Sequence, residues 1–111
     1  MDDCVIRAIA KVTDQSWEAV YLGLVKTGLE MKDLPNSNTV WASYLRNMDF
    51  VMRTLPDTCP HCYTVADFAA DHPDGRYVVA TGSHAVAVVF GNIYDAWDSS
   101  KEVAHYYFME R

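Results

Sequence analysis

The sequence predicts a single α+β domain over residues 1–111, in which N-terminal helices pack on a C-terminal antiparallel sheet. Apolar residues recur at helical spacing up to about residue 48, whereas short runs rich in Val, Tyr and Phe follow residue 75. Half of the 111 residues are hydrophobic, which is enough for one modest core. No linker, internal repeat or low-complexity tract divides the sequence.

Helices are expected mainly in the first half of the chain. One covers about residues 4–11, with an aspartate just before it as cap, and a second follows Ser16 as N-cap and ends near Gly28. A third begins with Asn38 as cap. Its apolar spacing predicts an inward face made of Val40, Trp41, Tyr44, Leu45 and Met48.

Strands dominate the second half. A short strand is expected at residues 51–55, and the spacing of Thr64 and Asp67 is that of a capping box, which predicts a helix over 65–70. The HPDG stretch at 72–75 is expected to turn. Beyond it, an antiparallel meander is predicted from runs at 76–81, 84–90 and 93–97, with a further strand at 103–109.

Composition limits the functional classes. The formal net charge of −6 and the scattered Lys and Arg argue against a nucleic-acid-binding protein. No run approaches the roughly 20 apolar residues of a membrane span, and acids stand where a secretory signal would be basic. We therefore expect a cytoplasmic protein that does not bind membranes. Nothing in the sequence indicates a cofactor or a metal ion.

Three residues form a candidate catalytic site: Cys4, His84 and Asp98. A thiol becomes a strong nucleophile when a histidine accepts its proton and a third group orients that histidine. The hairpin loop decides which carboxylate meets His84. A three-residue loop at 90–92 places Asp98 opposite His84, whereas a two-residue loop at 91–92 brings Asp95 to the same face. Asp98 is the preferred partner.

The segments DDCVIRAIA, SHAVAVV and YDAWDSS together resemble papain-like cysteine peptidases, particularly small peptidase-like proteins of bacteria and their phages. The resemblance implies a nucleophile at the start of a helix, a histidine on a strand and an Asn or Asp on the adjoining strand. Cys4, His84 and Asp98 match these places in order, with Trp97 beside them to shelter their hydrogen bond. It thus implies a thiol hydrolase acting on a peptide or protein substrate.

One part of the family pattern is missing. Papain-like enzymes usually carry a Gln ahead of the nucleophile as an oxyanion donor, but only Met1, Asp2 and Asp3 precede Cys4. The two acids also oppose ionisation of the thiol unless they turn away. Asn36, Asn38 or Gln15 are the alternative donors. The contrasting hypothesis is a noncatalytic interaction module, such as a phage anti-host or regulatory protein.

The remaining cysteines lie in the segment CPHC, residues 59–62. Such spacing occurs in redox sites and in half of a zinc site. Thioredoxin-like chemistry needs the pair at a helix start within a βαβ unit, and no second ligand pair exists for zinc. An exposed, oxidisable loop is the favoured interpretation.

Overall fold

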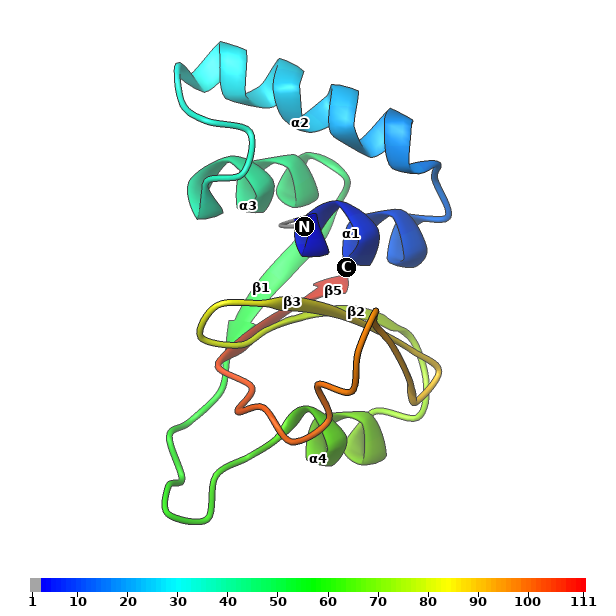
Figure 1. Cartoon of the computed structure of the whole chain (residues 1–111), viewed down its shortest axis with the longest axis vertical. Coiled ribbons are helices and arrows are strands. Elements are labelled where there is room, and N and C mark those ends of the chain that lie inside the picture. Colours follow the sequence, from blue (N-terminus) through cyan, green and yellow to red (C-terminus); the bar gives the residue numbers. More distant parts are fainter. Residues whose placement is uncertain (1–2) are drawn as a thin grey trace.

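The computed structural model describes residues 3–111 and confirms the α+β class. Within these residues, three helices precede the first strand, a fourth helix follows it, and four strands complete one sheet (Figure 1). The helices are α1 (Cys4–Thr13), α2 (Trp17–Met31), α3 (Asn38–Asn47) and α4 (Val65–Asp71). The strands are β1 (Phe50–Thr54), β2 (Arg76–Ala80), β3 (Ala85–Val89), β4 (Asn92–Tyr94) and β5 (Tyr106–Glu110).

Helices cover both faces of the sheet. Helices α1, α2 and α3 lie on one side and α4 lies on the other (Figure 1). Along β2, Val78 belongs to the core under the three N-terminal helices, while Val79 belongs to the core under α4. Because both faces are covered, β3 is apolar throughout and all five of its residues are buried.

The sheet is antiparallel, with strand order β1-β5-β2-β3-β4. The predicted meander is correct for β2, β3 and β4, but β5 does not continue it. Instead β5 returns across the sheet and lies between β1 and β2, where Phe108 pairs with both Met52 and Val78. Phe108 is fully buried and packs against Trp41 of α3. This contact between distant segments holds β5 in the interior of the sheet.

The predicted caps and ends of the helices are partly right. Ser16 caps α2 as expected, and Thr64 with Asp67 forms the reciprocal capping box of α4. Two predictions are wrong. Ser37, rather than Asn38, caps α3, and α2 continues past Gly28 to Met31.

Gly28 serves close packing instead of helix termination. A Cβ at this position would lie 2.7 Å from the carbonyl oxygen of Asp33, so only glycine lets the following loop pass so near. Helix α2 instead ends with Lys32 in the left-handed conformation.

The hairpin between β3 and β4 has a loop that differs from both predicted loops. Val89 pairs with Asn92, so the loop consists of Phe90 and Gly91. Both have positive φ, 49° and 78°, as a type I′ turn requires. The ladder ends at Tyr94, and the chain then leaves the sheet.

No helix within residues 3–111 combines the length and the apolar character needed to cross a membrane.

Candidate functional site

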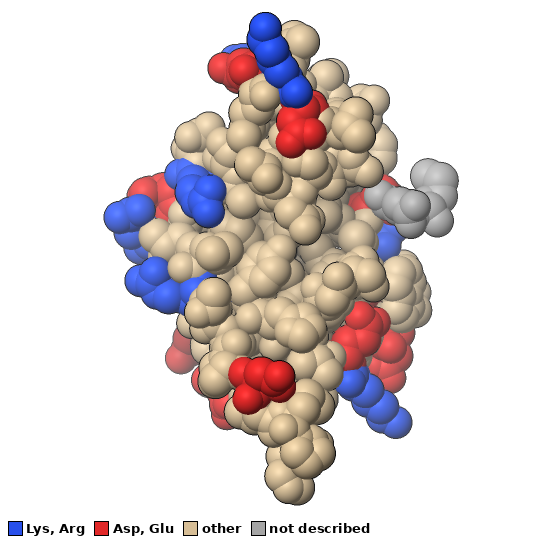
Figure 2. Space-filling view, turned by 90° about the vertical axis from the view of Figure 1, so that its left-hand side faces the viewer, with Lys and Arg blue, Asp and Glu red and all other residues tan. Residues whose placement is uncertain are grey.

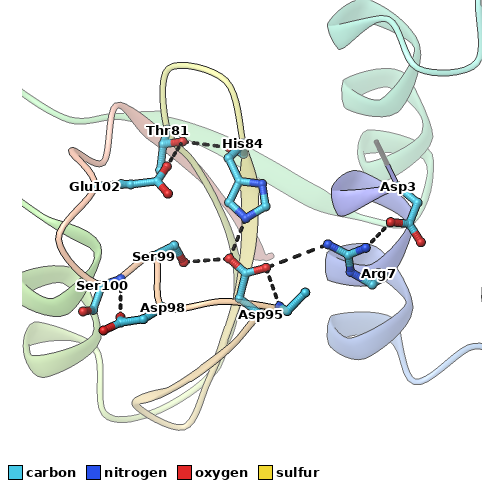
Figure 3. A network of polar contacts seen from close by, with 10 residues as sticks. Asp3, Arg7, Thr81, His84, Asp95, Asp98, Ser99, Ser100 and Glu102 are labelled. Carbon is cyan, nitrogen blue, oxygen red and sulfur yellow. Dashed lines mark hydrogen bonds and ion pairs between the residues drawn. The ribbon is translucent and has the colours of Figure 1, made fainter. Parts of the chain in front are cut away.

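His84 and Asp95 form a buried hydrogen-bonded pair at the N-terminal end of β3 (Figure 3). The Nε2 atom of His84 lies 2.5 Å from Oδ2 of Asp95, and the two side chains are only 5% and 4% exposed. A tight turn holds the histidine backbone, since the Thr81 amide donates to the His84 carbonyl at 2.8 Å. The pair is therefore fixed from both the turn and the loop after β4.

Three further groups hold the Asp95 carboxylate. Oδ2 accepts a second hydrogen bond from Ser99 Oγ at 2.7 Å, and Oδ1 accepts from the Ala96 amide at 2.7 Å. Arg7 of α1 places Nη2 3.9 Å from Oδ1. Burial raises the pKa of the Asp95 carboxyl, but the hydrogen bonds from Ser99, His84 and Ala96 outweigh burial and hold it below its ordinary value. Asp95 is thus a carboxylate at neutral pH.

The predicted contact between Asp98 and His84 is wrong. Asp98 is exposed, and its Oδ1 accepts a hydrogen bond from the Ser100 amide at 3.0 Å. Hydrogen bonding from the Ser100 side chain and from its amide lowers the pKa of the Asp98 carboxyl. The prediction extended the β3–β4 pairing as far as Asp98, but this pairing ends at Tyr94. The alternative partner, Asp95, is the residue that the structure places against His84.

Cys4 is the first residue of α1 and is half-buried. It lines a cavity of about 530 Å³ together with His84. A helix N-terminus presents unpaired amides and a partial positive charge, which favour a thiolate. The structure thus brings the predicted cysteine and histidine to the wall of one cavity.

Asp3 occupies the N-cap position of α1 without a capping hydrogen bond from its side chain. Its carboxylate instead pairs with Arg7 and accepts a hydrogen bond from Trp17 Nε1 at 3.0 Å. Burial raises the pKa of Asp3, but these two partners outweigh burial and lower it overall. The negative charge of Asp3 is therefore balanced by the positive charge of Arg7. Asp2 lies outside the described residues.

The second ring nitrogen of His84 is available to a substrate or a thiol. Nε2 is engaged by Asp95, and Nδ1 makes no hydrogen bond to the described part of the chain. Figure 3 shows Nδ1 on the side of the ring that faces α1. Trp97 stacks on the ring at a centroid distance of 4.3 Å, so it covers the His84–Asp95 pair as expected of a sheltering residue.

The three candidate oxyanion donors differ in position. Gln15 donates to Thr13 and Tyr44 and does not line the cavity. Asn36 and Asn38 do line it; Asn38 Oδ1 accepts from Trp41 Nε1 at 2.9 Å. The Asn38 side-chain N–H groups can therefore still donate into the cavity.

Sequence reasoning missed Arg7, Ser99 and Tyr106. Tyr106 lines the cavity, and burial raises the pKa of its hydroxyl, so it stays protonated. Arg7 lies in α1, far from Asp95 in the chain, so no local pattern connects the two. Ser99 follows Asp95 by four residues, but no helix over this loop gives that spacing a structural meaning.

Cys59 and Cys62 are joined by a disulfide in the loop between β1 and α4. Cys59 and His61 are exposed, as predicted for this loop. Residues 3–111 contain no cluster of His, Cys, Asp or Glu arranged to hold a metal ion.

No protein-family model, curated protein or solved structure matches this chain.

Proposed function

We propose that the chain is a cysteine hydrolase of papain-like architecture that cleaves a peptide or amide bond. The observation that carries the proposal is the shared cavity wall of Cys4 and His84, with Asp95 hydrogen-bonded behind the histidine. Cys4 is the nucleophile, His84 the acid and base, and Asp95 the orienting residue. The order of these groups along the chain is that of the resembling family.

The proposed reaction needs only these groups and water. His84 Nδ1 accepts the proton of Cys4, and the thiolate attacks the substrate carbonyl carbon. The first-turn amides of α1 stabilise the oxyanion, with Asn38 as a further donor. His84 then protonates the leaving amine as the C–N bond breaks. Water, deprotonated by His84, attacks the thioester and releases the acid and the thiol.

The cavity favours an uncharged acyl group. Among the described residues that line it, none is Asp, Glu, Lys or Arg, and Leu24, Trp41 and Tyr106 supply apolar surface. Figure 2 shows a face whose broad middle is uncharged, with charged side chains around it. A charged side chain buried in such a cavity would lose its hydration without gaining a partner. We therefore expect substrates with neutral, apolar side chains next to the scissile bond.

The test is selective alkylation of Cys4 by iodoacetamide at about pH 7, followed by mass spectrometry of the peptide that contains Cys4. Labelling without a reductant keeps Cys59 and Cys62 joined. We expect rapid labelling that slows by about tenfold or more in His84→Ala, because the thiol loses its base. His105→Ala, which changes an exposed histidine, is the matched control and should leave the rate unchanged.

Equally slow labelling in the wild type and in His84→Ala would contradict the proposal. The same result would favour the alternative, a noncatalytic interaction module. The exposed side chains of Leu22, Leu29 and Leu34 on and beside α2 would then be the surface to test for partner binding.

A further inference from the structure

We infer that Ser99 is a positioning residue of the candidate active site, an inference that rests on the proposed function. Its hydroxyl holds the Asp95 carboxylate, and Asp95 in turn holds His84. Ser99 is fully buried, and its Oγ lies 2.7 Å from Asp95 Oδ2. This is the same oxygen that contacts His84 Nε2. Ser99 therefore acts on the one oxygen that matters for the orientation of the imidazole.

Asp95 needs such a partner because the sheet does not hold it. Strand β4 ends at Tyr94, so no ladder hydrogen bond fixes the backbone of Asp95. The Ala96 amide fixes Oδ1, but it is the neighbouring residue and moves with the same loop. Arg7 approaches Oδ1 at 3.9 Å, beyond hydrogen-bond range. Ser99 is the remaining contact that ties Oδ2 to a separately anchored segment.

Helix α4 anchors that segment. The amide of Ala66 donates to the Ser100 carbonyl, and the amide of Val65 donates to the Glu102 carbonyl, each at 2.9 Å. The first amides of a helix have no partner within the helix, so they are free to hold another part of the chain. The Glu102 amide also donates to the Ser99 carbonyl at 3.0 Å. A continuous series of contacts thus runs from α4 through Ser99 to Asp95 and His84.

Removing the hydroxyl tests the inference through two readouts. In Ser99→Ala we expect Cys4 alkylation at about pH 7 to slow by about tenfold, the usual scale for a lost supporting hydrogen bond. We also expect the downfield proton resonance of the His84 Nε2–H group, protected by its bond to Asp95, to broaden or vanish. A serine that only fills space would not alter this resonance.

Ser100→Ala is the matched control, because the hydrogen bonds of Ser100 go to Ala66 and Asp98 and not to Asp95 or His84. It should preserve both the labelling rate and the resonance. Should Ser99→Ala fail to fold, as judged by circular dichroism, Ser99→Cys replaces it with a side chain of similar size and a weaker donor. That variant should show a shifted resonance and an intermediate rate, measured on the separate peptide that contains Cys4.

The outcomes separate the inference from the proposed function. Fast labelling in the wild type with an unchanged rate and resonance in the Ser99 variants would overturn the positioning role while leaving the function standing. Labelling of wild-type Cys4 as slow as that of His84→Ala would instead remove the function, and the inference with it.

Discussion

The choice between Asp95 and Asp98 turns on the environment of each carboxylate. Both follow β4 within a few residues, and each has a lowered pKa. Only Asp95 is buried, and its negative charge is balanced by hydrogen bonds that a solvated carboxylate would not need. A buried carboxylate beside an imidazole can both select the tautomer and stabilise the imidazolium.

Paired substitutions test this assignment. Asp95→Asn should slow Cys4 alkylation by about tenfold or more, because an amide neither stabilises the imidazolium nor fixes the tautomer as a carboxylate does. Asp98→Asn, which changes an exposed side chain, should have the rate of the wild type. Measured rate constants in the reverse order would return the orienting role to Asp98.

At the scale of elements, the α2–α3 connection depends on the close approach of the Asp33 backbone to Gly28 in α2. Helix propensity alone suggests that alanine at position 28 would help, because alanine favours a helix by about 1 kcal/mol over glycine. The structure predicts the opposite effect, since the new Cβ would meet the Asp33 carbonyl at 2.7 Å.

Gly28→Ala should therefore lower the free energy of unfolding, by about 1–3 kcal/mol as for other overpacked sites. Urea denaturation followed by circular dichroism measures the change. Gly82→Ala is the control, because a Cβ there meets only His105, at 3.9 Å. A higher free energy of unfolding in Gly28→Ala would mean that the loop at Asp33 moves away at little cost, and that its close approach to Gly28 does not require glycine.

The whole molecule should lose stability in acid partly through the Asp95 carboxylate of the candidate site. The pKa of Asp95 in the folded protein lies below its ordinary value of 3.8, so the unfolded chain binds more protons than the folded one in this range. The stabilisation from Asp95 is present above 3.8 and is lost as the pH falls through the lower folded value. Asp3 acts in the same direction.

Urea denaturation at about pH 6 and about pH 3 measures this loss. Asp95→Asn should lose less stability between the two pH values than the wild type, because its side chain does not titrate. Asp98→Asn is the matched variant for an exposed carboxylate. If the free energy of unfolding of Asp95→Asn fell by as much as that of the wild type between the two pH values, Asp95 would contribute no pH-dependent stability.

Local signals in the sequence determined the elements and two members of the candidate site. Helical spacing, the Ser16 cap and the capping box at Thr64 predict structure because their interactions lie within a few residues. Cys4 and His84 were identified by their chemistry and order along the chain. Both line the cavity that the structure contains.

Only the tertiary structure decided the sheet order, the partner of His84 and the roles inferred for Arg7 and Ser99. Strand β5 lies between β1 and β2, and its Phe108 packs against Trp41, a contact between residues far apart in the chain. The histidine meets Asp95 because a turn at Phe90 and Gly91 and the early end of β4 redirect the loop. The position of β5 and the partner of His84 both depend on how segments distant in the sequence pack together. Local residue preferences carry no information about that packing.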